Sequence, residues 1–152
     1  MNFSECMERN SKVLMEGALG ERLKREYGLL FDEQVAMAGL VYAKEGRTAL
    51  KELWNGYLSI AKKYRVPFLA TTPTRRANRE RVEKSSFDAS IIRDNVAFLR
   101  SVQQESDSIM YVGGLMGCKG MLILEKMRCQ RKRHFDSTPG RQSCLHRPVR
   151  IF

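Results

Sequence analysis

The sequence predicts an α/β fold with a parallel sheet, and three observations carry that prediction. Three short apolar runs have the composition of buried strands. Stretches with helical periodicity separate these runs, and crossovers of that length imply parallel strands joined in the right-handed sense. At 152 residues, of which 43% are hydrophobic, the chain is also long enough to bury one sizeable core.

The three expected strands each lead into a polar or glycine-rich segment. Residues 12–17 form an apolar run that ends in Glu16 and Gly17. Residues 65–72 are apolar up to a threonine pair at their carboxyl end, and residues 108–114 end in two glycines. In parallel sheets and barrels the working groups lie at this carboxyl edge, so we look for the site there.

The helices are predicted from apolar residues that recur at three- and four-residue steps. We expect helices over residues 20–27, over 31–41 and over 45–64, and then a polar loop or short helix over 73–87. Asp88 is a suitable cap for a last helix. The expected buried stripe of the 45–64 helix is Leu50, Leu53, Trp54, Tyr57, Leu58, Ala61 and Tyr64. The expected stripe of the last helix is Ile91, Ile92, Asn95, Val96, Leu99 and Val102.

The net charge of +10 is concentrated near the C-terminus. Residues 1–118 hold 18 Lys and Arg against 15 Asp and Glu, whereas residues 119–152 hold 9 against 2. The latter segment has no hydrophobic period, and we expect it to be an irregular basic tail behind a folded part at 1–118. Such a tail permits salt-sensitive contact with nucleic acid or an acidic partner, but it has only two aromatic residues and no recognised fold, which disfavours nucleic acid. A shifted reading frame would give the same pattern.

Cysteine usage and hydropathy exclude several classes of protein. Cys6, Cys118, Cys129 and Cys144 have no paired spacing, which argues against a disulfide scaffold and against a zinc motif in the tail. No apolar run approaches the roughly 20 residues of a membrane-spanning helix, and the first residues lack the layout of a signal peptide. We therefore expect a cytoplasmic protein without a membrane partner.

Each candidate residue at the carboxyl edge has a structural and a functional interpretation. Glu16 is either a turn carboxylate or a ligand contact, and the threonines at 71 and 72 are either strand formers or contacts. Glycines at 113, 114 and 117 suit a turn better than a phosphate site. The arginines at 75, 76, 79 and 81 could bind a phosphate or carboxylate, but Glu80 and Glu83 lie among them and favour a solvated helix face.

The strand ends resemble those of the homocysteine S-methyltransferase family. Residues 13–23 read Val-Leu-Met-Glu-Gly-Ala-Leu-Gly-Glu-Arg-Leu, similar to the family's opening strand, where an acidic residue and a glycine precede a small-apolar-Gly turn. Residues 72–81, Thr-Pro-Thr-Arg-Arg-Ala-Asn-Arg-Glu-Arg, resemble its Thr-Asn-Thr-aromatic segment followed by Ala-Asn. Residues 112–117, Val-Gly-Gly-Leu-Met-Gly, resemble its Ala-Gly-Ser-Ile-Gly strand end. The motifs keep the family's order and spacing over residues 12 to about 120.

The resemblance implies a (β/α)₈ TIM barrel that transfers a methyl group to a zinc-bound homocysteine thiolate. It implies that Glu16, Gly17 and Thr72 bind homocysteine, and that a methyl donor is the second substrate. The sequence departs from the family's pattern at three positions. Glu16 stands where the family usually has Asp, and Pro73 where it usually has Asn. Arg75 replaces an aromatic residue that often helps form the methyl-donor pocket. The family's zinc cysteines follow its sixth and eighth strands, and this chain has no counterparts of them.

We therefore expect a partial barrel of about the first three βα units, truncated and inactive alone. A complete barrel needs about 250 residues. One interpretation keeps the chain in the enzyme class, with a complementary barrel half from another chain, and it predicts self-association because half a barrel leaves a strand edge unpaired. Another is a non-enzymatic binding protein whose basic tail contacts nucleic acid or an acidic partner. A third is a frame-shifted product without a selected function.

Overall fold

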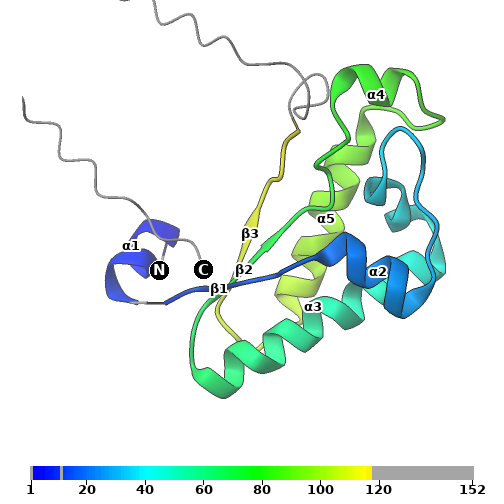
Figure 1. The fold of residues 1–152 in the computed structure, drawn as a ribbon. Helices are drawn as coiled ribbons and strands as arrows, with labels where there is room; N and C mark the ends of the chain where they lie inside the picture. The colour runs from blue at the N-terminus through cyan, green and yellow to red at the C-terminus, as the bar shows by residue number, and fades with distance from the viewer. Residues whose placement is uncertain (1, 11, 118–152) are drawn as a thin grey trace, which may run out of the picture. The chain divides into compact units, whose positions relative to one another are not determined.

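A computed structural model of the chain describes residues 2–10 and 12–117 (Figure 1). The predicted basic tail at 119–152 lies outside the described residues, as do Cys118, Cys129 and Cys144. In chain order the elements are α1 (Phe3–Arg9), β1 (Leu14–Met15), α2 (Leu19–Tyr27), the 3₁₀ helix η1 (Met37–Tyr42), α3 (Lys44–Tyr64), β2 (Phe68–Thr71), α4 (Arg79–Glu83), α5 (Ser90–Gln104) and β3 (Met110–Gly113).

The strands form a parallel sheet in the order β1-β2-β3, which confirms the predicted α/β class with a parallel sheet. Leu14 pairs with Phe68 and Phe68 with Met110, so the strands run in register. The crossover from β1 to β2 contains α2, η1 and α3, and that from β2 to β3 contains α4 and α5. All three strands therefore end at the same edge.

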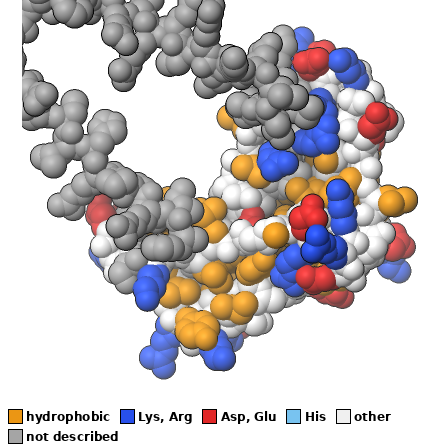
Figure 2. Space-filling view, in the orientation of Figure 1, with side chains coloured by type: hydrophobic (Ala, Val, Ile, Leu, Met, Phe, Trp, Pro, Cys, Tyr) orange, Lys and Arg blue, Asp and Glu red, His pale blue; other side chains and the backbone are white. Residues whose placement is uncertain are grey.

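The core lies between the sheet and the helices α3 and α5, which Figure 1 shows along one side of the strands. Trp54 and Phe68 are completely buried there, and the rings of Trp54 and Phe98 lie 6.0 Å apart. Alternate β2 residues, Phe68 and Ala70, face this core, as strand geometry requires. Figure 2 shows further hydrophobic side chains on the viewed face, over the strands and the adjoining part of α3, beside mixed charges over α2.

The helix predictions over 20–27, 45–64 and after Asp88 are confirmed, and their ends have local causes. Gly28 ends α2 with φ of 63°, a left-handed conformation that glycine adopts without strain. Arg65 ends α3 with φ of 51°. Asp88 is not the cap residue of α5, because the N-cap is Ala89 and has no side-chain cap bond, but Asp88 accepts a 2.7 Å hydrogen bond from the Ser90 amide at the start of that helix. The polar segment 73–87 contains the short helix α4.

Three details of the helix prediction were wrong. Residues 31–41 do not form one helix, because the Asp32 side chain accepts hydrogen bonds from two backbone amides in a turn, and only η1 is helical there. Tyr64 is 65% exposed at the end of α3, and Ile92 is 40% exposed. Phe98 of α5, which the predicted stripe omits, is buried.

Helix α1 was not predicted. It begins with a capping box in which the Glu5 amide donates to Asn2 Oδ1 at 2.8 Å and the Asn2 amide donates to Glu5 Oε2 at 3.1 Å. Its Phe3 ring packs edge-on against Tyr111 of β3 with the centroids 5.2 Å apart, and Cys6 is buried. Within residues 2–10 and 12–117, no helix has both the length and the apolar character needed to cross a membrane.

Candidate functional site

A cavity of about 360 Å³ lies at the carboxyl edge of the sheet. Glu16, Thr72 and Leu115, which follow the three strands, all line it. The start of α2, the segment from Phe31 to Met37 and the loop after β2 supply the other walls. Its volume lies at the lower end of the range of about 300–1,000 Å³ for small-molecule sites. The parallel fold has therefore brought together residues more than 40 positions apart in the sequence.

Glu16 is fixed through one of its two carboxylate oxygens. Oε1 accepts hydrogen bonds from the backbone amide of Thr71 at 2.7 Å and from its hydroxyl at 2.5 Å. Oε2 is buried and has no partner among the described residues. Burial raises the pKa of this carboxyl above its ordinary value of 4.5, and the hydrogen bonds from Thr71 only partly offset that effect. An unpartnered, desolvated oxygen in a cavity wall favours a ligand that donates a proton or a hydrogen bond.

Thr72 is almost completely buried, and its hydroxyl joins the ends of β2 and β3. Its Oγ1 accepts from the Leu115 amide at 3.1 Å and lies 2.7 Å from the hydroxyl of Thr74. Because the Thr74 hydroxyl donates its proton to the Leu115 carbonyl, Thr72 is the donor between the two hydroxyls. The hydroxyl of Thr72 is thus occupied by two protein partners, although one of its lone pairs remains for a ligand.

Gly17 lies next to Glu16 but does not line the cavity. Its carbonyl accepts a 2.8 Å hydrogen bond from the Tyr57 hydroxyl, and its amide donates to the same oxygen at 3.1 Å. The Tyr57 ring in turn stacks on Phe68, with the centroids 5.8 Å apart. Gly17 therefore anchors the chain beside Glu16, and its predicted contact with homocysteine stays a prediction.

Two of the three non-glycine residues with positive φ in the described chain line this cavity. Ala18 has φ of 50° before α2, and Ala36 has φ of 52° with ψ of −123° before η1. Each such conformation costs about 1–3 kcal/mol for a residue with a Cβ, and strain of this kind is common at functional sites. The backbone on this side of the cavity is therefore held in place against its local preference.

The four arginines of the cluster predicted from the sequence have different surroundings. Arg81 donates to the Gln34 carbonyl at 3.4 Å, and the other three divide into two parts. Arg79 pairs with Glu83 at 2.7 Å and Lys84 with Glu80 at 3.0 Å, so α4 carries the solvated face that was predicted. Arg75 and Arg76 precede α4 and line the cavity instead. Lys24 of α2 also lines it, with Nζ 5.1 Å from the centre of the Phe31 ring.

The described residues contain no group of three or more His, Cys, Asp and Glu that could hold a metal ion. Cys6, the cysteine that the structure describes, is the buried residue of α1 and does not line the cavity. Zinc, implied by the family resemblance, therefore has no fitting set of ligands in this part of the chain, and we derive no step through it.

Sequence reasoning identified Glu16 and Thr72, which the structure brings to one cavity, but it missed most of the wall. Lys24, Ala36 and Met37 come from segments that fold back over the edge. The glycine at 117 is required by packing, since a Cβ there would lie 1.8 Å from the Arg75 carbonyl oxygen. That close approach holds the loop of Arg75 against the segment after β3.

The fold and the cavity define a class: a parallel α/β unit with a ligand-sized cavity, lined by both charged and apolar side chains, where its strands end. Comparison with the models of known protein families gave no match. Neither a curated protein nor a solved structure matches the chain.

Proposed function

We propose that this chain binds homocysteine, or a closely related amino acid, at the cavity of Glu16, as the first part of a homocysteine S-methyltransferase-like (β/α)₈ barrel. The observation that carries the proposal is the unpartnered Oε2 of Glu16, because the α-ammonium group of an amino acid would supply the missing donor. The acidic-Gly motif at 16 and 17 and the threonine at 72 support the choice of amino acid by their resemblance to the family.

The topology is compatible with the opening of such a barrel. A barrel of this type adds parallel strands in sequence order, each followed by helical structure, and β1, β2 and β3 are neighbours in that order. The described residues supply three strands, whereas a closed barrel has eight. Methyl transfer would require the remaining strands and the zinc ligands from a complementary barrel half, so the activity proposed for these residues is binding.

In the proposed complex, each residue of the strand ends has one task. Glu16 Oε2 accepts from the ligand's ammonium group, and this charge pairing lowers the pKa of the carboxyl from its raised value. Thr71 keeps the other oxygen in place. Thr72 offers its remaining lone pair and closes the floor of the cavity, while Tyr57 holds Gly17 beside the site.

The test is a titration calorimetry experiment with the full chain, L-homocysteine and mercaptobutyrate, which is homocysteine without its amino group. Glu16→Gln should weaken homocysteine binding about tenfold or more, because it removes a charge-assisted hydrogen bond. It should leave mercaptobutyrate binding unchanged. Glu33→Gln, an exposed carboxylate outside the cavity, is the matched control.

Two outcomes would contradict the proposal. One is homocysteine binding that does not depend on Glu16. The other is an equal loss of both ligands in Glu16→Gln, which would make Glu16 a structural residue of the edge and not a partner of the ammonium group.

A further inference from the structure

The cavity is lined by cationic side chains as well as by the Glu16 carboxyl. Its described lining includes three cationic side chains, Lys24, Arg75 and Arg76, against two acidic ones, Glu16 and Glu21. Glu21 is exposed and lies 3.8 Å from Arg25, so it already has a cation beside it.

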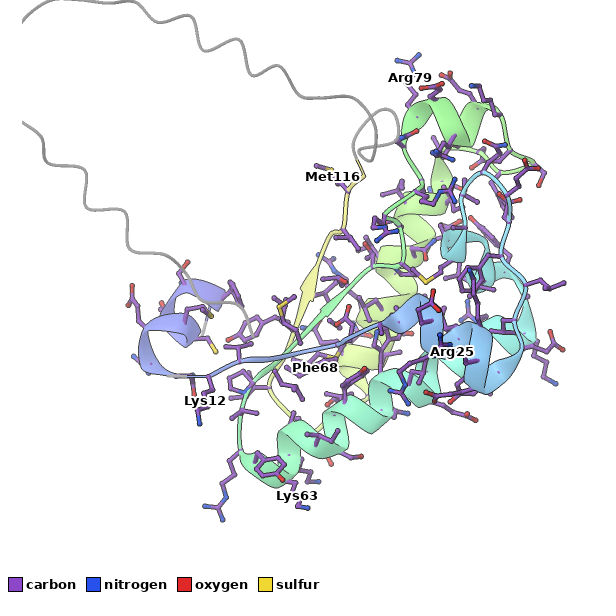
Figure 3. All side chains as sticks on the ribbon, viewed as in Figure 1. Lys12, Arg25, Lys63, Phe68, Arg79 and Met116 are labelled. Atoms are coloured by element: carbon purple, nitrogen blue, oxygen red, sulfur yellow. The ribbon has the colours of Figure 1, made fainter. Side chains whose placement is uncertain are left out.

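Of the three cations, Arg75 and Arg76 have no partner among residues 2–10 and 12–117, whereas Lys24 lies over the Phe31 ring. Neither makes a hydrogen bond or an ion pair with the rest of the described chain. Arg79, only three residues beyond Arg76, is paired with Glu83. Figure 3 shows Arg79 projecting from α4 at the top of the view. Two adjacent unpaired guanidinium groups at a cavity are a suitable receptor for a carboxylate, which arginine binds through two parallel hydrogen bonds.

The start of the loop that carries these arginines is fixed to the end of β3 and to the segment after it. The Thr72 amide donates to the Gly113 carbonyl at 2.9 Å, and the hydroxyls of Thr72 and Thr74 bond to Leu115. The Gly117 backbone packs directly against the Arg75 carbonyl. A loop held in this way presents its side chains at small entropic cost, which favours a binding role over a solvated one.

We infer that Arg75 and Arg76 form an anion subsite that binds a carboxylate group in the same cavity as Glu16. The cavity then recognises a ligand set with an ammonium group at Glu16 and a carboxylate at the arginines. The carboxylate belongs either to the amino acid itself or to a second molecule beside it. The inference rests on the proposed function for the amino acid, while the anion subsite has its own test.

The experiment titrates the full chain with three ligands. L-homocysteine carries both charged groups, mercaptopropylamine lacks the carboxylate, and succinate lacks the ammonium group. The variant Arg75→Gln/Arg76→Gln is compared with Arg79→Gln, which makes the same replacement at a paired arginine outside the cavity. Because all three arginines are exposed, thermal unfolding should show the variants to be folded.

We expect the double variant to weaken succinate binding about tenfold or more, and Arg79→Gln to leave it within about twofold. If the double variant also weakens homocysteine binding but not mercaptopropylamine binding, the carboxylate is that of the amino acid. If only succinate is affected, the carboxylate belongs to a second molecule. Either result supports the subsite.

Two results would refute the subsite. In the first, the double variant binds homocysteine and succinate as tightly as the unmodified chain does. In the second, the unmodified chain does not bind succinate, and the double variant keeps the full affinity for homocysteine. Failure of the proposed function has a different signature. In that case homocysteine does not bind, or binds independently of Glu16, while succinate binding still depends on Arg75 and Arg76.

Discussion

The helix-covered core of the sheet is well packed, whereas the carboxyl edge of the sheet contains strained backbone and an unpartnered polar atom. In the core, Trp54, Leu99 and Phe68 are buried almost without exposure and contribute by area and packing. At the edge, the fold keeps two alanines at positive φ and leaves a buried oxygen of Glu16 without a partner. Among the described residues of the core, Trp54 Nε1 and Asn95 Oδ1 are also buried without a partner, but neither residue lines the cavity at the carboxyl edge. The difference teaches that stability and recognition can be disturbed separately in this chain.

The largest expected effect is in the core. Trp54→Ala should lower the free energy of unfolding by about 3–5 kcal/mol, because it removes a fully buried indole and leaves a cavity. Ile92→Ala, at a half-exposed position of α5, should change it far less. Denaturant unfolding of both variants measures the contrast. If Trp54→Ala does not fold, Trp54→Phe replaces it in the measurement. If Trp54→Phe binds homocysteine as weakly as Glu16→Gln does, the core and the edge are not independent.

A smaller effect of opposite sign is expected at the edge. Ala36→Gly should raise the free energy of unfolding by about 1 kcal/mol, since glycine relieves the strain at φ of 52° and ψ of −123° and loses part of that gain to backbone entropy. Ala97→Gly, in the exposed interior of α5, should lower it by about 1 kcal/mol. Thermal or urea unfolding distinguishes these signs, and a loss of stability in Ala36→Gly would show that no strain is stored there.

The smallest expected effect is a pH dependence from Glu16. Its folded-state pKa lies above the ordinary value of 4.5, so the folded chain binds the proton more tightly than the unfolded chain. The corresponding stability is fully present below about 4.5 and is lost as the pH rises through the raised pKa. Unfolding of the unmodified chain, minus that of Glu16→Gln, should show this decline. A difference that rises with pH would mean that Glu16 is charged and paired in the folded chain.

Much of the fold could be predicted because its elements have strong local causes. The apolar period of α3 and the glycine after α2 act within a few residues, and the structure agrees with both. The Asn2–Glu5 pair was a readable helix start that we missed. The turn at Asp32 defeated the predicted helix over 31–41, because a side chain there competes for backbone amides.

The site could be predicted only in part, for a different reason. Glu16 and Thr72 were found because strand ends of a parallel sheet must meet at one edge. Lys24 and Ala36 reach the cavity through the path of the chain between β1 and α3, which no local pattern encodes. The separate roles of Arg76 and Arg79 depend on where α4 begins, and the sequence shows only one run of charges.

The burial of Trp54 also determines what the intrinsic fluorescence of this molecule measures. It is the only tryptophan of the chain, it lies fully inside the core, and its ring nitrogen has no hydrogen-bond partner among the described residues. Its emission should therefore resemble that of indole in an apolar solvent and shift to longer wavelength when water reaches it. Because Trp54 does not line the cavity, its fluorescence should change on unfolding and should not change when a ligand binds there.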